Sequence, residues 1–349
     1  MTSPTNVLMI GDFGKDLDDE FALLLAVALE RLGYIRLLGV VANLAPAIER
    51  ARLAKGTLQT LGLGRVPVAI GRPVTDAGRT CPHDTTVPYL ADASELSGEG
   101  IDLMRRVLSE ADDRSVTLVL NSAFTDAAAL ARSSPDLFLS RVSHVAIMGG
   151  VTERDGRLVP DDAANNAFDP AAAEFLYRWL QDNRVPTTVV MREAAYACQM
   201  AAWLPVKLAE IGHPVGLSLA RRLPLVMDDL WEAVHAPIGS PIRGTLPPSR
   251  TRDWYVRTTT GNKDPGVPGD ETVWPFVETF RLYDPMNLLA AVPELADRFY
   301  DADTFTVNGT AHKVIGRTKE CNGIRDPLAL RETLAQFATE ALAPFAGED

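Results

Sequence analysis

The sequence has little cysteine, little positive charge and no long apolar run. Its three cysteines, Cys81, Cys198 and Cys321, lie far apart without metal-type spacing, which suits a reducing compartment. The 349 residues hold 34 Lys and Arg against 46 Asp and Glu, and the net charge of −12 without a basic cluster argues against nucleic acid as a partner. No apolar run is long enough to span a bilayer, and the N-terminus lacks a signal-type segment, so we expect a cytoplasmic protein without membrane contact.

What the sequence does contain is a regular alternation of two patterns. Short runs rich in Val, Ile and Leu predict strands over residues 7–10, 37–42, 66–70, 116–120, 142–148 and 187–191. Longer stretches predict helices over residues 19–33, 48–61, 101–110, 123–132 and 171–179. Strands separated by helices imply parallel pairing through right-handed crossovers. We therefore expect an α/β protein with a mostly parallel, Rossmann-like open sheet of about six strands and helices on both faces.

The last part of the chain continues this pattern after an unusual segment. Between residues 202 and 273 the sequence has nine prolines and the tryptophans Trp203, Trp231 and Trp254, with Trp274 directly after them. Large aromatic side chains favour burial or a ligand, so a mixed helical and loop insertion near the functional site fits better than a linker. Beyond it we expect helices over 285–292 and 327–342 and strands over 305–307 and 313–315, all within one domain spanning residues 1–349.

Four aspartates fall within eight positions where the first strand meets the first helix: Asp12, Asp16, Asp18 and Asp19. Acidic residues favour the first turn of a helix, and this accounts for one or two of them. Four like charges beside an apolar strand repel one another, and a cation is the natural compensation. Carboxylate oxygens suit Ca²⁺ or Mg²⁺ better than Zn²⁺. The pattern favours a metal site over helix capping alone.

The spacing Asp-x-Gly-x-Asp-x-Asp-Asp over residues 12–19 resembles the N-terminal motif of the inosine–uridine-preferring nucleoside hydrolases, with two extra residues before the paired aspartates. Further segments are similar to motifs of that family in the same order: VVAN at 40–43, VPVAIGRP at 66–73, VTLVLNSAFTD at 116–126, VAIMGG at 145–150, ANNAFDP at 164–170 and YDP at 283–285. Together they cover most of the chain. The resemblance implies the nucleoside hydrolase fold and an oligomer, a homo-dimer or homo-tetramer.

The resemblance also implies a Ca²⁺ ion and assigns its ligands. They would be Asp12, Asp19, the backbone carbonyl of Thr125 and Asp284. The two extra residues leave either Asp16 or Asp18 for the sugar, and we favour Asp18 because the start of a helix fixes its position. Asn43, Asn165, Asn166 and Met148 are the other candidates for contact with the ribose, although turn chemistry explains any single Asn as readily. Asn121 is expected to be a turn residue.

This chain departs from the family at the end of the site that meets the base. Tyr283 stands where the family has a histidine that protonates the leaving base, and a phenol with a pKa of ~10 is a weaker acid. Three interpretations follow. Tyr283 is the acid or only stacks on the base; His235 supplies the proton; or the substrate differs, with Arg157 meeting a negative group at the 5′ position. Trp254 is a candidate to hold the base.

The implied activity is Ca²⁺-dependent hydrolysis of the N-glycosidic bond of a ribonucleoside or related N-riboside, giving free base and ribose. Asp12 would accept a proton from the attacking water, and nearby carboxylates would stabilise an oxocarbenium-like state. The alternative is a nucleoside- or sugar-binding protein that keeps the metal and ribose pocket but has little turnover. A metal-dependent phosphohydrolase is a weaker third hypothesis.

Overall fold

The computed structural model describes residues 3–14, 16–74, 85–244, 246–266, 268–269 and 271–344. Cys81 lies outside the described residues. The central feature is an eight-stranded sheet with the order β11-β12-β8-β5-β4-β1-β2-β3. Its strands are β1 (Thr5–Gly11), β2 (Ile35–Ala42), β3 (Val68–Ile70), β4 (Val116–Leu120), β5 (Val142–Met148), β8 (Thr187–Val190), β11 (Asp303–Val307) and β12 (Thr310–Ile315).

Parallel pairing dominates this sheet. Every neighbouring pair from β3 to β12 is parallel, and only β11, at the edge, runs antiparallel to its neighbour β12. The predicted α/β class and the mostly parallel open sheet are therefore confirmed. The sheet is wider than expected because the two late strands extend it beyond β8.

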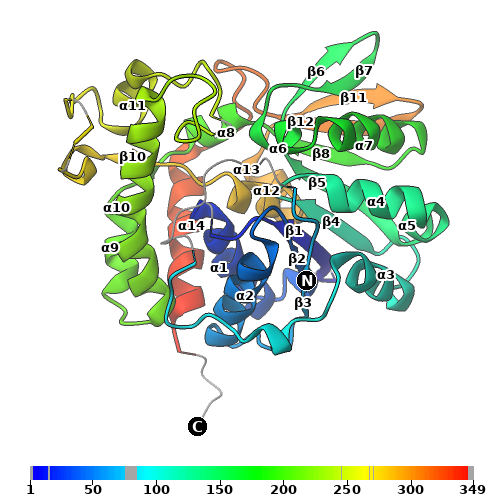
Figure 1. The fold of residues 1–349 in the computed structure, drawn as a ribbon. Coiled ribbons are helices and arrows are strands. Elements are labelled where there is room, and N and C mark those ends of the chain that lie inside the picture. The colour runs from blue at the N-terminus through cyan, green and yellow to red at the C-terminus, as the bar shows by residue number, and fades with distance from the viewer. Residues whose placement is uncertain are drawn as a thin grey trace.

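Helices cover both faces of the sheet (Figure 1). They are α1 (Asp18–Arg31), α2 (Ala47–Thr60), α3 (Gly100–Glu110), α4 (Thr125–Ser133), α5 (Pro135–Arg141), α6 (Ala164–Phe168), α7 (Pro170–Asp182), α8 (Arg192–Ala197), α12 (Asp284–Ala290), α13 (Pro293–Phe299) and α14 (Pro327–Leu342). Side chains of β1 alternate between two cores. Val7 and Met9 pack with α1, α2, α12 and α14, whereas Leu8 and Ile10 pack with α3, α4, α5 and α7. Burial on both faces explains the continuous apolar strands.

The segment after α8 forms a second group of helices beside the sheet. Its elements are β9 (Met200–Ala201), α9 (Leu204–Ala209), α10 (Pro214–His235), α11 (Arg252–Thr259), the 3₁₀ turn η3 (Trp274–Phe276) and β10 (Thr279–Phe280), which pairs with β9. Figure 1 shows α9 and α10 next to α14, at the side of the molecule away from β11. Trp231 and Trp254 are buried, but Trp203 is 60% exposed, which corrects the expectation that all these tryptophans are covered.

Some elements were not anticipated. The hairpin of β6 (Val151–Arg154) and β7 (Arg157–Pro160) and the short helices α5, α8 and α13 have no strong periodic signal. A 3₁₀ turn, η2 (Ala93–Glu95), precedes α3. None of the helices in the described ranges combines the length and the apolar character that a bilayer crossing requires.

Candidate functional site

A pocket with a volume of ≈ 370 Å³ lies at the carboxyl edge of the parallel strands. Its lining residues follow directly on strand ends: Asp12 after β1, Asn121 after β4, Gly149 after β5 and Arg192 shortly after β8. Open α/β sheets bind their ligands at this edge, because the loops that connect strands to helices gather there. The volume is in the range of small-molecule sites.

The other wall of the pocket comes from the segment after α8. It consists mainly of apolar side chains of α10, α11 and β10, which are Leu223, Val226, Met227, Leu230, Ala233, Trp254 and Phe280. An apolar wall opposite polar strand ends suits a ligand with one polar and one flat, apolar part. A nucleoside has this division between its sugar and its base.

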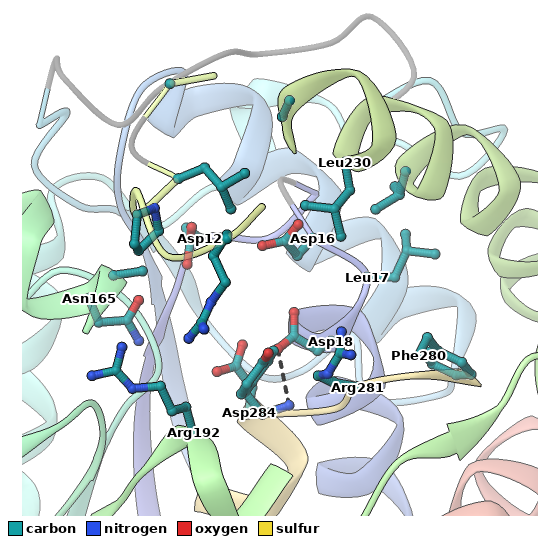
Figure 2. A pocket seen from close by; sticks show the side chains of 18 of the residues that line it. Asp12, Asp16, Leu17, Asp18, Asn165, Arg192, Leu230, Phe280, Arg281 and Asp284 are labelled. Carbon is teal, nitrogen blue, oxygen red and sulfur yellow. Dashed lines mark hydrogen bonds between the residues drawn. The ribbon is translucent and has the colours of Figure 1, made fainter. Parts of the chain in front are cut away.

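Three buried carboxylates meet on the polar side. Asp18, Asp19 and Asp284 each offer an oxygen, and these oxygens lie within 4.8 Å of one another. Figure 2 shows Asp18 and Asp284 next to each other, with Arg192 and Asn165 on one side and Arg281 and Phe280 on the other. Asp12 also lines the pocket and is 7% exposed.

The electrostatics of this cluster favour a bound cation. Burial, together with Asp16 and Asp12, raises the pKa of Asp18 to about 8. Burial is also the main reason that the pKa values of Asp19 and Asp284 lie well above their ordinary range, and the neighbouring aspartates add to it. Groups that resist ionisation this strongly hold protons or share a cation. A donor set of carboxylate oxygens fits a hard divalent ion such as Ca²⁺ or Mg²⁺.

The loop after β1 is fixed by backbone contacts. The backbone N–H of Asp12 donates to Oδ1 of Asp19 (3.0 Å), and Arg50 of α2 donates to the carbonyl oxygens of Asp12 (2.7 Å) and Phe13 (3.0 Å). Gly11 permits the approach of Asp19, since a Cβ at this position would lie 2.5 Å from Oδ1 of Asp19. Asp18 and Asp19 then occupy the first turn of α1, whose dipole favours negative charge.

Asp284 reaches this loop from the distant end of the chain. It is the first residue of α12, and the backbone N–H of Tyr283 before it donates to Oδ2 of Asp18 (3.2 Å). Further along α12, Asn287 donates to the carbonyl oxygen of Leu120 (3.1 Å) and to Oδ1 of Asn121 (2.8 Å). These bonds join α12 to the end of β4 and bring the acidic residues of both regions together.

Several residues predicted for the sugar and base line the pocket. Asp16, Asp18, Met148, Asn165 and Trp254 are among its lining residues. The amide of Asn165 donates to the carbonyl oxygen of Met148 (2.9 Å), which orients the Asn165 side chain at the end of β5. Asp18 is buried within the acidic cluster, whereas Asp16 is exposed at the pocket, and the choice between them for a ribose hydroxyl stays a prediction.

Three other predicted residues support the pocket from behind and are not among its lining residues. Asn43 is fully buried and its amide donates to Asp126 (3.0 Å), and Asn166 donates to the carbonyl oxygen of Gly150 (2.8 Å). The hydroxyl of Thr125 donates to Asp169 (2.8 Å), the N-cap of α7. These contacts fix loops and a helix start; ribose contact by the two asparagines and metal binding by the Thr125 carbonyl stay predictions.

Arg157 and His235 also lie elsewhere. Arg157 is on β7 and pairs with Asp182 of α7 (2.7 Å). His235 ends α10, where its Nδ1 bonds to the carbonyl oxygen of Trp231 (2.8 Å) and its ring packs against the indole. Neither residue is among those that line the pocket, so the structure does not bring the expected anion contact of Arg157 or the expected proton donor His235 to this site.

Tyr283 does line the pocket, and its ring meets Tyr196 edge-on at a centroid distance of 6.4 Å. Burial, with a smaller contribution from Tyr196, raises the pKa of the Tyr283 phenol above its ordinary value. The phenol is therefore protonated at neutral pH and is a weak acid.

The pocket also contains polar residues that the sequence analysis missed. They are Asn121, Arg192, Tyr196, Asp229, Arg243, Arg250 and Arg281. Asn121 and Arg192 follow predicted strands within two residues, so their position at strand ends was a usable signal. Arg250 and Arg281 lie in or beside the proline-rich segment, where no periodic pattern indicates which side chains face inward.

Comparisons with known proteins agree with this geometry. The family model described as inosine-uridine preferring nucleoside hydrolase matches residues 8–239. No curated protein matches the chain. Among solved structures, the type III effector protein XopQ complexed with adenosine diphosphate ribose is 28% identical, with a TM-score of 0.82 over 98% of this chain and 94% of its own.

Two further structures share the fold. The effector protein XOO4466 is 28% identical, with a TM-score of 0.80 and coverage of 98% of this chain and 95% of its own. The purine-preferring ribonucleoside hydrolase from Gardnerella vaginalis is 15% identical, with a TM-score of 0.60 and coverage of 97% and 99%, which shows similarity of fold alone. From the match to the family model, this chain belongs to the inosine-uridine preferring nucleoside hydrolase family.

Proposed function

We propose that the protein hydrolyses the N-glycosidic bond of a ribonucleoside or related N-riboside in a Ca²⁺-dependent reaction, giving free base and ribose. The observation that carries this proposal is the buried cluster of Asp18, Asp19 and Asp284 in a pocket with an apolar opposite wall. XopQ supports a ribose-type ligand, since its structure is a complex with adenosine diphosphate ribose. The cytoplasm as location and a homo-dimer or homo-tetramer as assembly are part of the proposal.

The residues of this chain have separate roles in that reaction. Asp19 and Asp284 of the expected ligand set, with Asp18 of the same buried cluster, would hold the ion, and Asp12 and the carbonyl of Thr125 remain candidate ligands. When bound, the ion supplies a positive charge that orients water and lowers its pKa. Asp12, at the end of β1, accepts a proton from the attacking water. The carboxylates stabilise positive charge that develops on the sugar ring, and Asn165 positions a ribose hydroxyl.

The test is a panel of purified nucleosides assayed for reducing sugar, with Ca²⁺ present and after its removal by a chelator. We expect ribose release from at least one member of the panel with Ca²⁺ and at least about tenfold less after chelation, because the acidic cluster needs a cation to act. Ca²⁺-dependent binding without release would contradict the proposed hydrolysis and favour the alternative of a nucleoside- or sugar-binding protein. The raised pKa of the Tyr283 phenol, which makes it a weak proton donor, favours this alternative.

Tyr283→Phe tests the leaving-group side. We expect kcat for uridine to fall about tenfold to a hundredfold, at the low end of general acid catalysis, because a phenol of raised pKa is a weak acid. The leaving group of a nitrophenyl riboside needs no protonation, so kcat for this substrate should fall less. An equal loss on both substrates, measured by steady-state kinetics, would show that the hydroxyl matters only for packing.

A further inference from the structure

Two arginines face the same pair of aromatic rings in the pocket. The guanidinium carbon of Arg250 lies 5.4 Å from the ring centre of Tyr196 and 5.1 Å from that of Trp254. The corresponding distances for Arg281 are 5.2 Å and 5.1 Å. Aromatic faces attract a guanidinium and restrict its orientation. Two cations from distant positions in the chain are therefore held over one aromatic platform, Tyr196 and Trp254.

Neither guanidinium forms a close ion pair within the described part of the chain. Among the described residues, no carboxylate lies within 4.0 Å of Arg250 or Arg281. The other two pocket arginines are held differently: Arg192 pairs with Asp161 (2.8 Å) and Asp162 (2.5 Å), and Arg243 donates to the backbone carbonyl oxygens of Pro247 (2.9 Å) and Arg250 (3.0 Å). Arg281 donates one Nη to the carbonyl oxygen of Thr258 (2.7 Å), and its Nε is buried without a partner in the described structure. Asp162 and Glu193 interact with Arg250 only at longer range. Two like charges without a close acidic partner among the described residues favour an anion in the pocket.

We propose that Arg250 and Arg281 bind a phosphate group of the substrate, so that the pocket takes phosphorylated N-ribosides in preference to neutral nucleosides. The inference rests on the proposed hydrolysis for the sugar end of the same ligand. Arginine matches phosphate because its planar fork donates two parallel hydrogen bonds to the oxygens. Because Tyr196 and Trp254 already restrict the two guanidinium groups, each loses less conformational entropy when it binds a phosphate.

The arrangement of charge in the pocket agrees with a ligand of this kind. The aspartate cluster favours a cation and, in the proposed reaction, the sugar end of the ligand, whereas the two arginines, without a close ion pair among the described residues, offer positive charge to a second group. Arg281 precedes Tyr283 and Asp284 by two and three residues, so one short stretch of chain links both kinds of group. The anion contact that the sequence suggested for Arg157 is thereby assigned to Arg250 and Arg281 instead.

Calorimetric titration of the full chain, with Ca²⁺ at fixed excess, tests this proposal. Adenosine is compared with adenosine 5′-diphosphate, and ribose with ribose 5-phosphate, the second pair being independent of the base. We expect the phosphorylated member of at least one pair to bind ten times more tightly or better. Arg250→Gln and Arg281→Gln should each reduce that preference at least fivefold without weakening the unphosphorylated member.

Arg257→Gln is the matched control, because Arg257 is an exposed arginine on α11 that does not line the pocket. It should retain the full preference. Equal binding within both pairs, or a preference that survives both pocket substitutions, would overturn the phosphate site. Ribose release from neutral nucleosides is measured separately. Hydrolysis without a preference for the phosphorylated ligand would refute only this inference. A preference for the phosphorylated ligand without ribose release would refute only the proposed hydrolysis.

Discussion

Asp12→Asn is expected to lower kcat for nucleoside hydrolysis by about 10³-fold, the loss typical when a general base is removed. The fold should persist, because the described contacts of Asp12 with its surroundings use the backbone. Its N–H donates to Asp19 and its carbonyl oxygen accepts from Arg50, and an asparagine keeps both bonds. The rate is measured by reducing-sugar release and the fold by circular dichroism.

The control for Asp12→Asn is Asp102→Asn, which removes one negative charge from an exposed position on α3. It should leave kcat unchanged, so that net charge alone is excluded as a cause. Turnover of Asp12→Asn at the rate of the unmodified protein would refute the assignment of Asp12 as the base. The ion would then be expected to act with a different carboxylate of the pocket.

Arg222→Met is expected to have the largest effect on stability. Arg222 of α10 forms an ion pair with Glu20 of α1, and both side chains are at most 1% exposed. The hydroxyl of Tyr89 donates to the same carboxylate (3.2 Å). Removing the guanidinium leaves a buried carboxylate without its charge partner, which costs about 3–5 kcal/mol. The free energy of unfolding is measured by urea denaturation.

Two further variants separate this effect from general damage to a helix. Glu20→Gln combined with Arg222→Met removes both charges and should recover part of the loss, because no buried charge remains unpaired. Lys207→Met breaks an exposed pair with Glu210 on α9 and should change the unfolding midpoint little. If Arg222→Met is as stable as Lys207→Met, the pair does not anchor α10 to α1.

Much of the fold follows from the sequence because burial and periodicity act locally. The six predicted parallel strands appear near their expected positions, since strands buried on both faces need continuous apolar runs such as that of residues 7–10. α10 was expected only as part of a mixed segment, because Pro224 lies inside this 22-residue helix. The hairpin of β6 and β7 has only two buried residues, Val151 and Leu158, and therefore little apolar pattern to reveal it.

The polar side of the site was more predictable than its other wall. Strand ends indicate which side chains share an edge, and this places Asp12, Met148 and Asn165 at one pocket. The same rule does not separate lining residues from supporting ones, since Asn43 also follows a strand but points into a buried network with Asp126. Arg250 and Arg281 were missed because their positions depend on how α10 and α11 pack over the sheet.

The two walls of the pocket have separate origins in the chain, and this bears on how such a protein can diverge. Most of the acidic residues belong to the loop after β1 and the first turn of α1, whereas Trp254 and Arg250 lie between β9 and β10, beyond the residues that match the family model. Mutation in the later segment can therefore alter ligand choice while the acidic side of the pocket is inherited unchanged. Exchanging that segment between relatives should transfer selectivity with it.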